Sequence, residues 1–168
     1  STESLVGNAP PIISEVTLSA DPAYTDSTLT VNSVASDVDG HGVTLVYTWY
    51  SGNIFIQSGG SSLSGDLFSK GDTIYVDAIA TDGIDDSEVL SSNSIEIRNT
   101  APSTPEISLT GLDSDGSETD PPSEEDDLLC RVDSASDLDG DVLSYGFAWT
   151  VDGAEWTGAQ SDNLNTGD

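Results

Sequence analysis

Basic residues are scarce in this sequence, with 3 Lys and Arg against 31 Asp and Glu and a formal net charge of −28. Binding nucleic-acid phosphates requires clustered cations, so nucleic acid is excluded as a partner. The same charge disfavours an anionic membrane surface. No run of about 18 apolar residues is present, so we expect no membrane insertion.

Residue types that carry catalysis are also scarce. The chain has one Cys, one His and no Met, and one Cys cannot form a disulfide within the chain. His41 lies inside an Asp-Gly turn, where we expect an exposed turn residue rather than a base or a ligand. The sequence has no Gly-x-Ser-x-Gly elbow, phosphate loop or His-Glu-x-x-His motif. We predict that the chain is not an enzyme, although its carboxylates leave glycosidase chemistry open.

An excess of carboxylates this large needs compensation, because like charges repel and destabilise a compact state. Bound divalent cations would neutralise acids that are clustered in loops. A high-salt environment would instead screen acids that are spread over all exposed faces. The acids of this sequence are clustered, which favours bound cations.

An internal repeat organises the chain. The segment Ser-Asp-Val-Asp-Gly at 36–40 returns as Ser-Asp-Leu-Asp-Gly at 136–140, and Trp49 returns as Trp149 at the same offset of 100. Asn-Ala-Pro at 8–10 is echoed by Asn-Thr-Ala-Pro at 99–102. The repeat predicts an N-terminal extension over 1–7, a first copy over 8–99 and a second copy over 100–168.

Apolar residues recur with period 2, which is typical of β-strands. The clearest predicted strands begin near Ile12, Leu29, Val43, Ile74 and Ile95, and Val34 suggests a bulge in the second of them. Clusters of Gly, Asp and Ser separate the strands every 8–12 residues. About seven short strands in about 90 residues predict an all-β fold, a β-sandwich with Trp49 buried in its core.

Several motifs together resemble bacterial extracellular immunoglobulin-like tandem repeats, the group that includes PKD-like and cadherin-like modules. They are the Asn-Thr-Ala-Pro start, Ser-Asp-x-Asp-Gly before the Trp strand, Lys-Gly-Asp-Thr at 70–73 and Thr-Asp-Gly at 81–83. The resemblance implies tandem immunoglobulin-like β-sandwiches at a cell surface, and it covers residues 8–168. It carries no individual calcium ligands with it.

The topology of such a sandwich returns two acidic loops of the first copy to its N-terminal end. Because Ca²⁺ takes six to eight oxygen ligands on flexible loops, these neighbouring loops predict a metal site. Asp-Gly turns that bind nothing are the alternative. The five predicted ligands are Asp37, Asp39, Asp82, Asp85 and Asp86.

The junction of the copies is a second candidate. Asp137, Asp139 and Asp141 of the second copy are expected to approach the first copy there, beside Asp21 and Asp26. An ion at this place would set the angle between the copies. A short Pro-containing linker that is stiff without metal is the alternative.

The densest acidic segment, residues 113–127, lengthens the second copy and has eight acids in fifteen positions. Its Asp-x-Asp-Gly places Gly at the fourth position rather than the sixth, so it is not an EF-hand loop. Ion binding through Asp113, Asp115 and Asp120 is one expectation. A solvated, mobile loop is the other.

The resemblance also bears on Cys130, which falls on the predicted second strand of the second copy, with Trp149 on the third. In an immunoglobulin-like sandwich such a Cys pairs with one on the sixth strand. That strand would begin just after residue 168, so we expect the second sandwich to lack its last strands in this sequence. Further residues or a neighbouring chain would complete it. A free, buried Cys is the alternative.

These observations predict a structural or adhesive extracellular protein: a stalk, an adhesin segment or a filament subunit, stiffened by Ca²⁺. The expected partners are other copies of the repeat or neighbouring subunits, together with surface glycans or proteins. An accessory carbohydrate-binding module of a larger secreted enzyme is the alternative. Tyr50, Phe55 and Trp156 could stack on sugars in that case, but Tyr24, Tyr50 and Phe55 are typical of packing at the rim of a sandwich.

Overall fold

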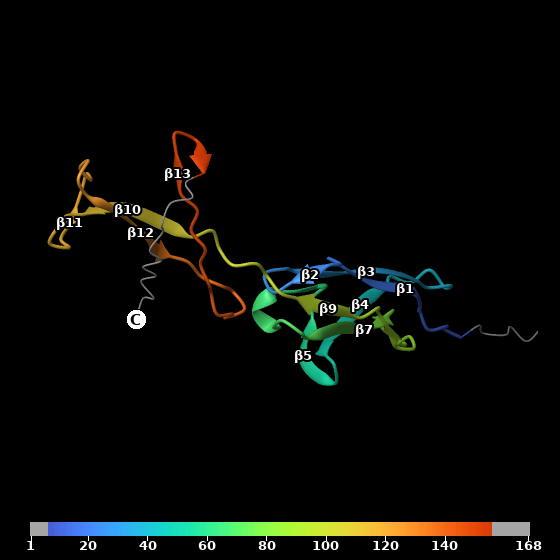
Figure 1. The fold of residues 1–168 in the computed structure, drawn as a ribbon. Helices are drawn as coiled ribbons and strands as arrows, with labels where there is room; N and C mark the ends of the chain where they lie inside the picture. Colours follow the sequence, from blue (N-terminus) through green and yellow to red (C-terminus); the bar gives the residue numbers. More distant parts are fainter. Residues whose placement is uncertain (1–6, 156–168) are drawn as a thin grey trace, which may run out of the picture. The chain divides into compact units, whose positions relative to one another are not determined.

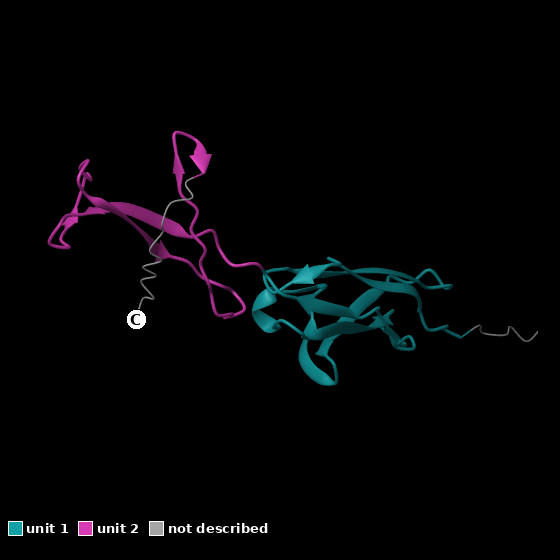
Figure 2. Ribbon diagram, in the orientation of Figure 1, with its two compact units in different colours: residues 1–100 teal, residues 101–168 magenta. Residues whose placement is uncertain are grey.

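The computed structural model describes residues 7–155. The chain divides into two compact units, Ser1–Thr100 (unit 1) and Ala101–Asp168 (unit 2), coloured separately in Figure 2. In the described residues the regular structure consists of β-strands and one 3₁₀ turn, Gly65–Leu67. The predicted all-β fold is therefore confirmed. No helix in this part of the chain is long and apolar enough to cross a membrane.

Unit 1 contains two sheets (Figure 1). The smaller sheet has the order β1-β3-β6, and the larger has the order β2-β9-β7-β4-β5 with β8 also paired to β7. All neighbours are antiparallel except β2 and β9. The strands are β1 (Ile12–Ser19), β2 (Ala23–Tyr24), β3 (Leu29–Ser36), β4 (Thr44–Ser51), β5 (Ile54–Gly59), β6 (Ser62–Leu63), β7 (Thr73–Thr81), β8 (Leu90–Ser91) and β9 (Ile95–Arg98).

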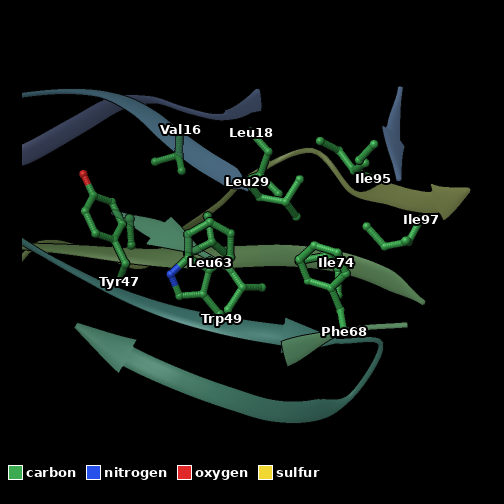
Figure 3. Packing of buried hydrophobic residues seen from close by; sticks show 13 residues of the cluster. Val16, Leu18, Leu29, Tyr47, Trp49, Leu63, Phe68, Ile74, Ile95 and Ile97 are labelled. Carbon is green, nitrogen blue, oxygen red and sulfur yellow. The ribbon is translucent and has the colours of Figure 1, made fainter. Parts of the chain in front are cut away.

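The core lies between these two sheets because each strand alternates its side chains. In β7 every second residue from Ile74 to Ala80 is buried, while Tyr75, Asp77 and Ile79 alternate with them on the outer face. Trp49 of β4 is fully buried, as predicted, and its Nε1 donates a hydrogen bond to the Gly60 carbonyl at 3.0 Å. Figure 3 shows Trp49 among the apolar side chains of both sheets. Unit 1 is thus a β-sandwich.

The predicted bulge lies on the other strand of its pair. Pairing between β1 and β3 shifts between Ile13 and Glu15, so the extra residue is Ser14 of β1. Its hydroxyl donates to the Val34 carbonyl at 3.2 Å. The expected bulge at Val34 is wrong because β3 keeps a regular alternation and β1 accommodates the irregularity.

Unit 2 contains a three-stranded sheet, β11-β10-β12, and a two-stranded hairpin, β13-β14. Ile107, Leu109 and Leu128 of this sheet are 62%, 50% and 51% exposed. Cys130 lies opposite Leu109 as a half-buried free thiol, and its disulfide partner stays a prediction. The strands are β10 (Glu106–Leu112), β11 (Glu118–Thr119), β12 (Asp127–Ser134), β13 (Thr150–Val151) and β14 (Ala154–Glu155).

The third strand expected in the second copy does not include Trp149. Residues 141–149 form no strand, and β13 begins at Thr150. Trp149 is half-buried, whereas Trp49 is fully buried. The difference follows from pairing: Trp49 lies on a strand flanked by β5 and β7, while Trp149 lies outside the strands of the described residues.

Candidate cation-binding sites

Three segments that are distant in sequence meet at one end of unit 1. The side-chain Nδ2 of Asn8, which precedes β1, donates to Asp82 Oδ2 and to Asp85 Oδ2, both at 2.8 Å. The backbone N–H of Ala9 donates to Asp39 Oδ2 at 2.7 Å. The loop after β3 and the loop after β7 therefore lie side by side, as the sandwich topology predicts. We call Asn8, Asp37, Asp39, Asp82 and Asp85 the entry site.

The first loop is shaped by Asp37. Its Oδ1 accepts the backbone N–H groups of Asp39 at 2.9 Å and His41 at 3.0 Å. Gly40 has a φ of +78°, a left-handed conformation that glycine adopts without strain. The turn thus follows from the Asp-x-Asp-Gly sequence itself, and it leaves the second oxygen of Asp37 outside this hydrogen-bond pattern.

Asp82 shapes the second loop. Its Oδ1 accepts the backbone N–H groups of Ile84 and Asp85, both at 2.8 Å. These bonds favour the charged carboxylate, and so does the amide of Asn8. The Asp85 backbone N–H contributes most, and together they lower the pKa of Asp82 to about 2. Asp82 is therefore an anion at neutral pH.

The entry site has unsatisfied buried oxygens. Asp37 Oδ2 and Asn8 Oδ1 are buried and have no hydrogen-bond partner. The side chains of Asp37 and Asp82 are 0% exposed. A buried carboxylate is costly unless a positive charge or a full set of hydrogen bonds compensates it. The entry site therefore combines acidic ligand groups with a buried carboxylate oxygen that a bound cation would compensate.

His41 places an imidazole, a metal-binding group, beside the entry site. Its Nδ1 lies 3.7 Å from Asp37 Oδ1 and 3.8 Å from Asp82 Oδ2, and its side chain is 44% exposed. Ligand atoms of Asp37, Asp39 and His41 all lie within 4.8 Å of one another. The exposed turn position of His41 agrees with the prediction, but the sequence pattern did not indicate that its ring faces two carboxylates.

The structure gathers four of the five predicted ligands. Asp86 is exposed, and its backbone pairs with Thr81 in an isolated bridge. Sequence reasoning missed Asn8, whose side chain ties the segment before β1 to the loop after β7. The sequence signal that could have indicated Asn8 is the repeat: Asn8 begins the Asn-Ala-Pro segment, which recurs as Asn-Thr-Ala-Pro at the start of the second copy.

Unit 2 repeats the first loop closely. Asp137 Oδ1 accepts the backbone N–H groups of Asp139 at 2.9 Å and Asp141 at 3.1 Å, and Gly140 has a φ of +74°. Ligand atoms of the three aspartates lie within 4.8 Å of one another. This loop is a second acidic cluster, and the ion predicted between the two copies stays a prediction.

The acidic segment 113–127 is built from turns closed by its own acids. Asp113 Oδ1 accepts the Ser117 N–H at 2.9 Å, and Asp115 Oδ1 accepts the Ser117 hydroxyl at 2.6 Å. Asp126 Oδ2 accepts the Thr119 hydroxyl at 2.6 Å. These hydroxyl bonds lower the pKa of Asp115 and of Asp126.

The remaining predicted ligand of this segment, Asp120, is exposed. The acids that the structure orders here act as hydrogen-bond acceptors within their turns. Their ion binding stays a prediction.

Aromatic side chains on the outer face of the larger sheet contact one another. Tyr50 stacks on Tyr75 at 5.1 Å between ring centroids and meets Phe55 edge to face at 6.3 Å. Trp156 lies outside the described residues.

No family model, curated protein or solved structure matches the chain.

Proposed function

We propose that this protein is an extracellular or cell-surface spacer, a stalk or adhesin segment made of immunoglobulin-like units and stiffened by Ca²⁺. Its role is structural rather than catalytic, and its partners are other repeat units or surface molecules. The carrying observation is the entry site, where one carboxylate oxygen, Asp37 Oδ2, and the amide oxygen of Asn8 are buried without a hydrogen-bond partner.

The strand order of unit 1 supports the immunoglobulin-like assignment. Such sandwiches place their first, second and fifth strands in one sheet and their third, sixth and seventh in the other. In unit 1 the sheet β1-β3-β6 has the first arrangement, and β9-β7-β4 has the second. The short β2 lies parallel to β9 and extends the larger sheet.

The position of the entry site supports a stiffening role. Asn8 and Ala9 belong to the segment that leads into β1, and both bond to carboxylates of the loops. A cation held by these loops would attach the incoming chain to the body of unit 1. Restricting a segment of this kind fixes the direction from which a preceding part of the chain arrives.

A carbohydrate-binding role has less support. Sugar binding on a sheet uses exposed ring faces, but the faces of Tyr50 and Tyr75 are stacked on each other. Phe55 is 58% exposed and presents one ring. The contacts among Phe55, Tyr50 and Tyr75 are better explained as cross-strand packing across β5, β4 and β7.

Calcium titration of the whole chain tests the proposal. We expect Ca²⁺ to bind with measurable heat and to raise the thermal midpoint by several degrees at saturation, because ligand binding stabilises the folded state. Asp37→Asn keeps an oxygen for the loop hydrogen bonds but removes the charge. We expect it to weaken calcium binding about tenfold or more, equivalent to about 1.4 kcal/mol.

Glu96→Gln is the matched control, because it removes one exposed acid from β9, outside the entry site. It should bind calcium like the original chain. Small-angle scattering with Ca²⁺ and with chelator then measures stiffening, which should narrow the distribution of distances within the chain. Calcium binding that both variants retain unchanged would refute the entry site as the seat of the cation.

A further inference from the structure

The two Asp-x-Asp-Gly loops differ at one chemically decisive position. Their backbones follow the same pattern, with the first aspartate accepting the N–H groups two and four residues later. In unit 1 the residue four positions on is His41, and in unit 2 it is Asp141. The first loop therefore offers a nitrogen ligand where the second offers a carboxylate.

His41 faces the entry site at distances suited to a shared metal ion. Its Nδ1 lies 3.7 Å from Asp37 Oδ1 and 3.8 Å from Asp82 Oδ2, which is too long for a hydrogen bond. Two ligands of one tetrahedral Zn²⁺ lie about 3.4 Å apart, given bonds of about 2.0–2.2 Å. A contraction of a few tenths of an ångström would bring the ring nitrogen to this ligand spacing from each of the two carboxylates.

A second observation points to a ligand independently of the acidic cluster. Asp37 has a fully buried side chain, and its Oδ2 has no hydrogen-bond partner. This oxygen belongs to the same carboxylate that His41 faces. A cation bound between the ring and the carboxylates would give this oxygen a partner.

We propose that the entry site binds a borderline divalent metal of the Zn²⁺ class through His41 Nδ1 and the carboxylates of Asp37, Asp39 and Asp82. The loop of unit 2, which has only oxygen ligands, binds hard cations and discriminates against Zn²⁺. This inference rests on the proposed function, because it names the metal preference of the same entry site.

Ligand chemistry supports this division between the loops. Imidazole suits Zn²⁺, Cu²⁺ and Ni²⁺, whereas Ca²⁺ and Mg²⁺ are bound by carboxylate, carbonyl and water oxygens. Replacing one carboxylate of an acidic site by imidazole removes an oxygen that Ca²⁺ uses and adds the nitrogen that Zn²⁺ prefers. The entry site would then take Zn²⁺ in preference to Ca²⁺ when both metals are present, whereas the loop of unit 2 would not.

The test is a zinc titration of the complete chain without a histidine tag, by calorimetry in the presence of excess Ca²⁺. His41 is the only His, so its ring resonances in NMR report zinc binding at this residue alone. We expect Zn²⁺ to shift those resonances. We expect His41→Asp, which gives the first loop the ligand set of the second, to weaken zinc binding by about 10–100-fold, comparable to the loss of a group that supports a metal site.

Asp141→Asn is the matched control, because it removes the corresponding ligand from unit 2. It should leave the tight zinc-binding event unchanged. Unshifted His41 resonances at saturating Zn²⁺, or equal zinc affinity in His41→Asp, would overturn the inference. If calcium still binds in that case, the proposed function stands; if neither metal binds, both fail.

Discussion

The ionisation of Asp82 is coupled to the fold. Its carboxylate accepts two backbone N–H groups and the Asn8 amide, so its pKa falls from 3.8 to about 2. All of these bonds depend on the folded arrangement of Asn8 and the loop. The unfolded chain, which lacks them, holds the proton more tightly than the folded chain does.

This difference predicts a specific loss of stability in acid. Because the folded pKa is the lower one, the contribution of Asp82 is fully present above pH 3.8 and is lost as the pH falls toward about 2. We expect the denaturation midpoint in metal-free buffer to fall across that range. Asp82→Asn should show a flatter fall, and Glu88→Gln, at an exposed position after the loop, should follow the original curve. Parallel curves for all three proteins would contradict the assignment.

The positions of individual candidate ligands were predictable only where local sequence determines them. Asp37 and Asp39 were predictable because the turn that presents them is encoded in five consecutive residues. The role of Asn8 was not predictable, because its partners are 74 and 77 positions away. An Asn two positions before a Pro does not by itself indicate which residues it contacts. Asp86 stays a prediction: its backbone pairs with Thr81, and a composition of adjacent acids does not reveal which of them bond to Asn8.

At the level of elements, β4 lies between β7 and the edge strand β5 and carries Trp49, the largest fully buried side chain of the described residues. The ring lies in the core between the sheets, and its N–H reaches the carbonyl of Gly60, beyond β5. Strand β4 therefore relies on a contact that combines apolar burial with one hydrogen bond. Both parts can be removed separately by substitution.

Trp49→Phe should destabilise unit 1 by about 1–3 kcal/mol, because it removes the N–H donor and leaves the Gly60 carbonyl unsatisfied. Trp49→Ala should cost about 3–5 kcal/mol, because it also opens a cavity. Chemical denaturation followed by circular dichroism measures both. Phe55→Leu, at a ring that is 58% exposed, is the control and should change stability little. An equal effect of Trp49→Phe and Phe55→Leu would contradict the central role of Trp49.

The strands were more predictable than their irregularities. Alternation in β7, β4 and β9 is a property of each strand alone, so a period of two locates the buried residues directly. The bulge at Ser14 depends instead on which of the two paired strands contains the extra residue. The burial of Trp149 depends on whether other strands pair with its segment. Both are properties of pairing, which single-strand patterns do not encode.

At the scale of the whole molecule, the formal charge of −28 produces repulsion that any cation can reduce. Screening by monovalent salt acts on all exposed charges and strengthens gradually as the Debye length falls from about 30 Å at 0.01 M to about 8 Å at 0.15 M. Site binding saturates once the ligand exceeds its dissociation constant. The two forms of compensation therefore differ in the shape of their concentration dependence.

We predict that both forms occur and can be separated. In chelator, added NaCl should raise the thermal midpoint gradually, without a plateau at low millimolar concentration, because it screens the whole surface. At matched ionic strength, CaCl₂ should raise the midpoint further and then level off, because a saturable site adds about 2.7 kcal/mol at a hundredfold excess over its dissociation constant. In Asp37→Asn, calcium should no longer raise the thermal midpoint beyond the effect of salt, because the substitution removes a central group of the entry site. The gradual rise of the midpoint with NaCl should remain, because only one of 31 acidic charges is lost. Coinciding NaCl and CaCl₂ curves would mean that the acids serve solubility and salt tolerance, and the cation-stiffened spacer would then have no physical basis.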